Sequence, residues 1–122
     1  MATLRTLPKA AALGLVAVAA CSLFYTEIDS YPCPPAGTTL RYGNFGATFM
    51  DSHCQSCHGS QSIDRQGAPG EFIFDTVEQI QRHRARIFVR SAADNNSMPP
   101  GPDDPTAEER RQLAEWLACG AP

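Results

Sequence analysis

Two cysteines and a histidine stand close together near the middle of the chain, in the order Cys54-Gln55-Ser56-Cys57-His58. The C-x-x-C-H spacing is typical of covalent haem attachment. Two thiols three positions apart can each add to one vinyl group of the same porphyrin, and the adjacent imidazole can bind the iron through a ring nitrogen. The motif therefore predicts one haem c held by Cys54 and Cys57, with His58 as an axial ligand.

Three other interpretations of this motif fit the sequence less well. A zinc site needs two more ligands, such as a second C-x-x-C pair or two downstream histidines, and His83 has no histidine near it. A thioredoxin-like motif follows a β-strand, but no β-branched run precedes Cys54. A disulfide within the motif leaves His58 without a role, so haem attachment is the prediction that we retain.

A haem that only transfers electrons needs a second axial ligand, and Met98 is the best candidate. It lies 40 residues after His58, in the sequence Ser97-Met98-Pro99-Pro100. Proline restrains the residue before it to extended backbone, so two successive prolines can hold a thioether in place without a helix. A methionine–histidine pair raises the reduction potential and fills both axial positions of the iron.

Other side chains are weaker candidates for this second position. Met50 lies on an apolar helix face and is expected in the core. His53 is next to Cys54 and is poorly placed to reach the far side of the ring. His83 is the strongest rival, because it lies at the edge of an apolar helix stripe, although such a histidine is more often a boundary residue.

The first 20 residues have the pattern of a secretory signal peptide. Two basic residues precede an unbroken run of small and apolar residues from Ala10 to Ala20, which is too short for a stable membrane span. The next residue, Cys21, resembles the lipid-modified cysteine of a bacterial lipobox, with Val18 where leucine is usual. We expect acylation of Cys21 and a membrane tether; the alternative is ordinary cleavage nearby, with Cys21 free or in a disulfide.

The remaining cysteines predict a disulfide. The chain has five cysteines, and haem attachment and lipidation use three of them, which leaves Cys33 and Cys119. Because an exported chain meets oxidising conditions, we expect these two to pair and to join the start of the mature domain to its end. A loop of this length adds about 4 kcal/mol of stability in the chain-entropy model. The alternative is that both thiols are reduced and buried.

Apolar periodicity predicts an all-α haem domain over residues 40–122, preceded by a tether and lead-in over residues 21–39. Its three main helices are expected over about residues 42–56, 76–92 and 104–118, with Asp75 or Thr76 capping the second and a capping box from Thr106 to Glu109 in the third. No run predicts a strand. The predicted apolar faces consist of Phe45, Phe49 and Met50, of Val77, Ile80, Ile87 and Phe88, and of Leu113, Trp116 and Leu117.

Two details of these helices carry further expectations. Gly43 and Gly46 weaken the first helix, and their missing side chains allow another helix to come close. Arg82, Arg86 and Arg90 recur every four residues in the second helix. Such a row is expected on a solvated face of the helix.

The chain resembles the small class I c-type cytochromes over about residues 40–120. The resemblance rests on the Cys54-x-x-Cys57-His58-Gly59 motif, the Met98-Pro99-Pro100 loop and a final helix that carries Trp116-Leu117. It implies an all-α cytochrome c-like fold around one covalently bound haem. It also implies that the first and last helices cross near Gly46 and Trp116.

Two more site residues follow only from this resemblance. In such cytochromes a proline carbonyl after the motif often accepts a hydrogen bond from the proximal histidine, and Pro69 is the residue nominated here. Arg84, near the middle of the second helix, is a candidate partner for a haem propionate. The alternative for Arg84 is that its stem lies along apolar surface while its charge stays in water.

The charge balance narrows the partners. From Cys21 onward the chain carries eight arginines, no lysine and 13 acidic residues, a net charge of −5. This balance disfavours nucleic acid as a partner. It favours redox partner proteins that carry a basic docking surface.

Together these observations predict a mono-haem electron carrier that is tethered by a lipid to a membrane in the bacterial periplasm. We expect it to be a monomer and not to be an enzyme by itself. Ser22, rather than an aspartate, follows Cys21, which favours the outer membrane. A haem-based sensor of small ligands and a haem subunit of a larger oxidoreductase are the alternative functions.

Overall fold

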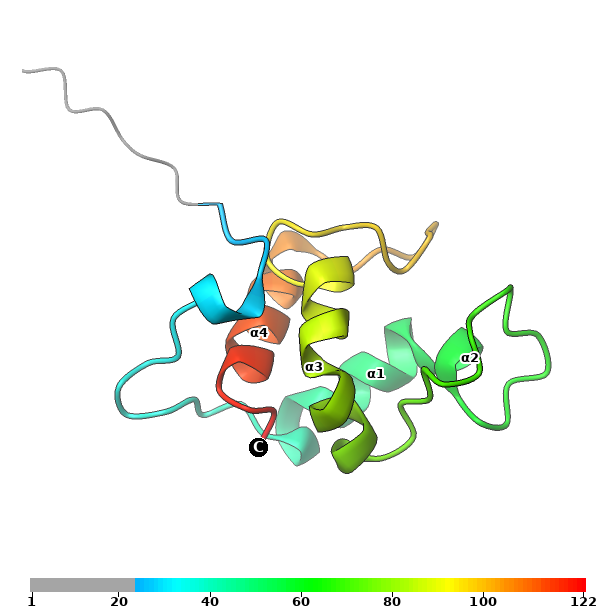
Figure 1. The fold of residues 1–122 in the computed structure, drawn as a ribbon, viewed down its shortest axis with the longest axis horizontal. Helices are drawn as coiled ribbons and strands as arrows, with labels where there is room; N and C mark the ends of the chain where they lie inside the picture. Colours follow the sequence, from blue (N-terminus) through cyan, green and yellow to red (C-terminus); the bar gives the residue numbers. More distant parts are fainter. Residues whose placement is uncertain (1–23) are drawn as a thin grey trace, which may run out of the picture.

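A computed structural model describes residues 24–122, so the predicted signal peptide and Cys21 lie outside the described part of the chain. Within this part the regular elements are all helical, which confirms the predicted all-α class (Figure 1). No helix among these residues is long and apolar enough to cross a bilayer. In chain order the elements are the 3₁₀ helix η1 (Ile28–Ser30), the π-helical turn η2 (Tyr42–Gly46), α1 (Ala47–His53), α2 (Gln55–His58), α3 (Val77–Ser91) and α4 (Ala107–Ala118).

The first predicted helix is divided into three pieces, η2, α1 and α2. It starts with a wide turn, in which the Arg41 carbonyl accepts hydrogen bonds from the amides of Phe45 and Gly46 at 2.9 and 3.1 Å. It breaks at Cys54, whose φ of −125° lies outside the helical range, and continues to His58. The break separates the C-x-x-C-H segment from α1, and no glycine or proline in that segment predicts it.

Capping boxes fix the starts of α3 and α4. The Thr76 hydroxyl accepts from the Gln79 amide, and the Gln79 side chain accepts from the Thr76 amide. Thr106 and Glu109 exchange the same two hydrogen bonds, at 3.2 and 2.8 Å. The last helix therefore begins after Thr106, later than the position near residues 104–105 predicted from the sequence, and the buried Pro105 precedes its cap.

The core forms where α1, α3 and α4 meet. The close approach of the first and last helical segments depends on Gly46: a β-carbon there would lie 2.5 Å from Cη2 of Trp116. This is the crossing that the resemblance implied. The largest fully buried side chains are Trp116, Phe88, Met50, Ile80, Leu113 and Leu117.

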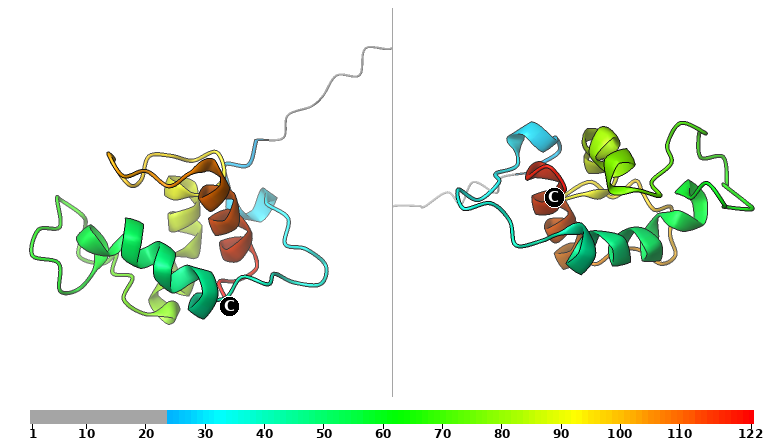
Figure 2. Two further views of the ribbon diagram at one scale, coloured as in Figure 1. Left: turned by 180° about the vertical axis from the view of Figure 1, so that it is seen from behind. Right: turned by 90° about the horizontal axis from the view of Figure 1, so that it is seen from below.

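The segment before η2, predicted as a tether and lead-in, packs on the domain from Tyr25 onward (Figure 2). Ile28 is buried, and the Tyr31 ring meets the Phe88 ring edge-on at 5.8 Å. A disulfide joins Cys33 to Cys119 across a separation of 86 residues. The segment therefore covers α4 and part of α3 as an integral layer of the domain.

The Gly46–Trp116 contact predicts a position-specific effect of adding one methyl group. We expect Gly46→Ala to lower the free energy of unfolding by about 1–3 kcal/mol, because the helices must separate to admit the methyl group. Gly43→Ala is the matched control: its β-carbon would meet nothing within 4 Å, and it should be neutral or slightly stabilising. Denaturant unfolding of the haem-loaded protein measures both. Equal effects of the two substitutions would contradict this account of the crossing.

The disulfide predicts a second stability effect. Replacing both Cys33 and Cys119 by serine should lower the free energy of unfolding by about 4 kcal/mol, because the unfolded chain then loses a long-range restraint. The measurement is again denaturant unfolding, and Thr39→Ser in the same segment is the control. An unchanged unfolding midpoint in the double serine variant would show that the bond adds no stability.

Candidate functional site

The residues predicted to do chemistry gather around one cavity of about 420 Å³. Its walls come from α2, from α3 and from the loop between α3 and α4, which lies on another side of the cavity from α2 in Figures 1 and 2. Met98 therefore comes next to the C-x-x-C-H motif despite the 40 residues between them. The lining residues predicted from the sequence are Cys54, Cys57, His58, Pro69 and Met98.

The imidazole of His58 is held by two neighbours that follow it in the chain. Its Nδ1 lies 2.9 Å from the Phe72 carbonyl oxygen, and its ring stacks on Phe74 at 4.7 Å between centroids. A carbonyl oxygen can only accept, so Nδ1 must carry the proton. The lone pair is then on Nε2, which is the arrangement that a metal-binding histidine needs.

The acceptor for His58 was wrongly nominated as Pro69. The Pro69 carbonyl accepts instead from the Phe72 amide at 3.1 Å and from Arg65 at 2.9 Å. These bonds close a turn over residues 69–72, so the carbonyl that reaches the imidazole is three residues further on. Pro69 still lines the cavity, but it does not orient His58.

Arg65 organises the loop that follows the motif. Its guanidinium donates to the carbonyl oxygens of Gly59, Ala68 and Pro69, at 3.2, 3.3 and 2.9 Å, and a longer contact of 3.5 Å reaches Phe72. One side chain thus pairs carbonyls from both ends of the loop. The sequence analysis assigned no role to Arg65, because a single arginine in a loop has no recognisable pattern.

The two motif cysteines are free of disulfides. Burial raises the pKa of the Cys54 thiol to about 12, so this thiol is neutral near pH 7. A neutral thiol is a poor redox nucleophile, because thiol–disulfide exchange and metal binding use the thiolate. This property argues against the thioredoxin-like interpretation and is compatible with a thiol destined for a thioether bond.

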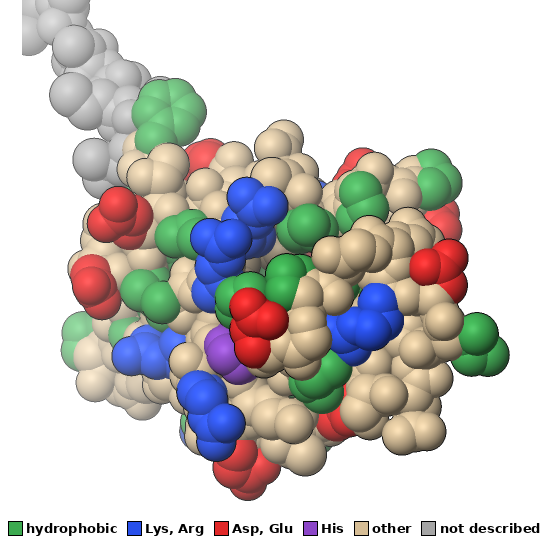
Figure 3. Space-filling model, turned by 45° about the vertical axis from the view of Figure 1, so that its right-hand side comes forward, with side chains coloured by type: hydrophobic (Ala, Val, Ile, Leu, Met, Phe, Trp, Pro, Cys, Tyr) green, Lys and Arg blue, Asp and Glu red, His purple; other side chains and the backbone are tan. Residues whose placement is uncertain are grey.

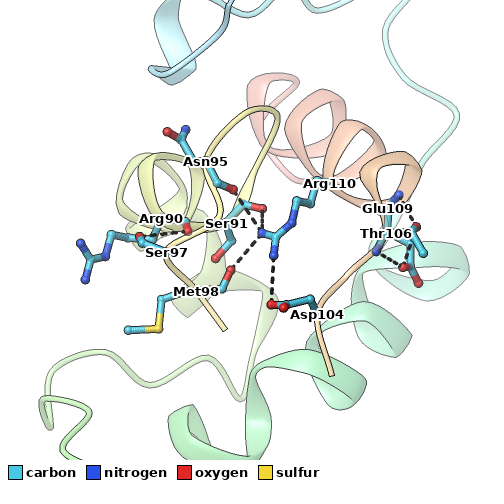
Figure 4. A network of polar contacts seen from close by, with 9 residues as sticks. All are labelled: Arg90, Ser91, Asn95, Ser97, Met98, Asp104, Thr106, Glu109 and Arg110. Carbon is cyan, nitrogen blue, oxygen red and sulfur yellow. Dashed lines mark hydrogen bonds and ion pairs between the residues drawn. The ribbon is translucent and has the colours of Figure 1, made fainter. Parts of the chain in front are cut away.

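Met98 lies in a loop whose main chain is tied to both neighbouring helices. Its amide donates to the Arg90 carbonyl of α3 at 2.8 Å. Its carbonyl accepts from the Arg110 guanidinium of α4 at 2.9 Å, and its side chain points away from Arg110 in Figure 4. Met98 also lines the cavity, so its thioether is available there.

Arg84 does not reach this site. Its guanidinium donates to the Leu117 carbonyl near the end of α4, at 3.2 Å, and it does not line the cavity. Its nomination as a propionate partner is therefore wrong. Arg86 and Arg90, predicted on a solvated face, line the cavity instead, because a step of four keeps them on the helix side that faces it.

The edge of the cavity is locally basic. Arg65, Arg86 and Arg90 are in its lining together with one carboxylate, Asp103. Figure 3 shows a face on which arginine side chains surround hydrophobic side chains and a histidine. Basic groups beside an apolar cavity fit a flat apolar ligand that carries carboxylates.

The other two histidines differ in their access to the cavity. His53 lines it, and its buried Nδ1 has no hydrogen-bond partner among the described residues. Its Nε2 lies 3.7 Å from Glu109, whose pKa is lowered mainly by the hydrogen bonds from Thr106. His83, the rival axial ligand, packs on the Phe72 ring at 5.2 Å and does not line the cavity.

This set of residues fits a haem c. Cys54 and Cys57 would hold the porphyrin through thioethers, and the Nε2 of His58 and the sulfur of Met98 would bind the iron. The unpartnered Nδ1 of His53 provides one more polar contact for a bound group. Such a group supplies reversible one-electron chemistry between ferrous and ferric iron. The chain would bind it, orient both axial side chains and limit the access of water.

The comparisons with known proteins agree with this geometry. No curated protein and no solved structure matches the chain. Residues 44–117 match the family model described as cytochrome c oxidase, cbb3-type, subunit III. This match extends from η2 to the end of α4 and includes the C-x-x-C-H motif and the Met98 loop, so the chain belongs to this family of c-type cytochrome domains, which bind haem c covalently.

Proposed function

We propose that this protein is a single-haem c-type cytochrome that carries electrons while tethered to a membrane in the periplasm, and that it is not an enzyme by itself. One observation carries the proposal: Cys54, Cys57, His58 and Met98 line the same cavity, although they come from different segments of the chain. Membership of a c-type cytochrome family supports the covalent haem.

The ligand set supports electron transfer rather than ligand binding. Two axial side chains from the protein would fill both open positions on the iron, so a small molecule must displace one of them to bind. Both are held in place by hydrogen bonds, His58 through the Phe72 carbonyl and Met98 through its own peptide. Little rearrangement is then needed when the iron changes its oxidation state.

Export and tethering rest on the sequence and on the disulfide. The Cys33–Cys119 bond is of the kind that persists in an oxidising compartment. The N-terminal pattern around Cys21 supports lipidation, and the outer membrane remains our preference because Ser22 follows it. Cys21→Ser should release the protein from washed membranes into the soluble fraction, and retention on the membrane would contradict a lipid anchor.

The family description favours a second function. It names a subunit of a cytochrome c oxidase, so this chain could serve as the haem subunit of a larger oxidoreductase. Mild-detergent purification from the native membrane distinguishes the two. A chain that elutes alone and exchanges electrons with soluble partners supports the carrier, and stoichiometric co-elution with oxidase subunits supports the second function.

The visible spectrum and carbon monoxide test the axial ligands. We expect the purified protein to show a reversible c-type spectrum and to resist carbon monoxide in its ferrous form. Met98→Ala should open the iron to rapid carbon monoxide binding and lower the midpoint potential on the order of 100 mV. Met50→Leu, a volume-conserving change of a buried methionine away from the cavity, is the control and should change neither property.

Two outcomes would overturn parts of this proposal. A natively matured protein without covalent porphyrin would end the haem proposal. Rapid and complete carbon monoxide binding by the wild-type protein would favour the sensor, because Met98 would then not block the iron.

The corrected arginine assignments give a test of the local field. Arg86→Gln should lower the midpoint potential by roughly 20 mV, because a nearby positive charge favours the ferrous state. Arg84→Gln is the matched control: it removes the same charge from the same helix, at a residue that does not line the cavity. Potentiometric titration at low ionic strength measures both. A larger shift for Arg84 would restore its role as the partner of the cofactor.

A further inference from the structure

We infer that Arg110 is the positioning residue for the axial thioether: its buried guanidinium fixes the main chain of the loop that presents Met98. The inference rests on the proposed function, in which Met98 binds the iron. Nothing in the sequence analysis singled out this arginine. Figure 4 shows it between α4 and the loop, with Met98 on the other side of the shared hydrogen bond.

The first step is the burial of Arg110. Its residue is only 7% exposed, and it lies on the side of α4 that also carries the buried Leu113, Ala114 and Leu117. A charged group in such a position needs several hydrogen-bond partners, because its transfer from water is otherwise very costly. The chain supplies these partners from one place, the loop between α3 and α4.

The second step is the set of partners. Nη1 donates to the carbonyl oxygens of Ser91, Asn95 and Met98, at 2.8, 3.1 and 2.9 Å. Nη2 lies 3.5 Å from the Asp104 carboxylate. Arg110 also uses its own backbone, since its carbonyl accepts from the Ala93 amide at 3.0 Å. One residue therefore ties the start, the middle and the Met98 end of the loop to α4.

The third step is that the peptide groups on both sides of Met98 are fixed. Its amide is held by the Arg90 carbonyl and its carbonyl by Arg110. If the loop moved away from the cavity, the buried guanidinium would lose several carbonyl partners at once. Because that loss is costly, Arg110 disfavours every loop conformation in which the thioether has left the site.

The test compares Arg110→Met and Arg110→Lys in the haem-loaded protein. Arg110→Met removes all of these hydrogen bonds at similar length, and Arg110→Lys keeps the charge without the planar array of donors. We expect the ferrous Met variant to bind carbon monoxide about 10- to 100-fold faster than wild type. The weak red absorption band of ferric iron bound to a thioether should fade in parallel, with Lys intermediate.

Arg111→Met is the matched control, because Arg111 is the next residue on α4 but is exposed and pairs with Glu108 on the surface. It should leave carbon monoxide binding and the red band unchanged. A second control repeats Arg110→Met in the Met98→Ala background. There the iron is already open, so a positioning role predicts no further acceleration.

The outcomes separate the inference from the proposed function. A wild-type protein that lacks the red band contradicts methionine ligation itself, whatever Arg110 does. A normal wild type with unchanged Arg110 variants overturns the positioning role alone. Acceleration that persists in the Met98→Ala background would mean that Arg110 only stabilises the fold, which also overturns it. If Arg110→Met does not accumulate, the same comparisons with Arg110→Lys decide.

Discussion

The site depends on two loops that have little regular structure, and each is fixed by the guanidinium of one arginine. Peptide carbonyls in a folded chain need donors, and a helix or a sheet normally supplies them. Here Arg65 pairs carbonyls of the loop after the motif, and Arg110 pairs those of the loop before α4. Arginine suits this task because its planar donors can serve several acceptors at once. Both axial side chains therefore depend on a hydrogen-bonded frame that lies outside the iron's own ligands.

The rest of the domain gives that frame a rigid base. Gly46 lets the first helical segment come directly onto Trp116, and the indole nitrogen of Trp116 donates to the Pro122 carbonyl at 3.2 Å. The Cys33–Cys119 disulfide joins the other end of the described chain to the same region. A domain of this size has a small core, so the covalent link and a covalently held cofactor both add buried contacts or restraints that the side chains alone do not supply.

The charges are arranged unevenly around this core. The mature chain is acidic overall, yet Arg65, Arg86 and Arg90 line the cavity. Net charge therefore describes steering at long range but not the field at the site. In the same way, the regular spacing of arginines in α3 was interpreted as a solvated face, whereas two of the three line the cavity. Helical periodicity tells which residues share a face, but it does not tell which face the cavity uses.

The sequence by itself determined the chemistry and the class of fold. The C-x-x-C-H motif, the methionine before two prolines and the helix caps are local patterns, and local physics sets their meaning. Tertiary structure decided which groups serve those residues. Phe72 rather than Pro69 orients His58 because a turn closes over residues 69–72. Arg84 is drawn to the Leu117 carbonyl, and Arg110, which shares a helix side with Leu113 and Leu117, is buried against carbonyls that lie up to 19 residues away. Such partners are set by packing between distant segments, and spacing along the chain carries no record of it.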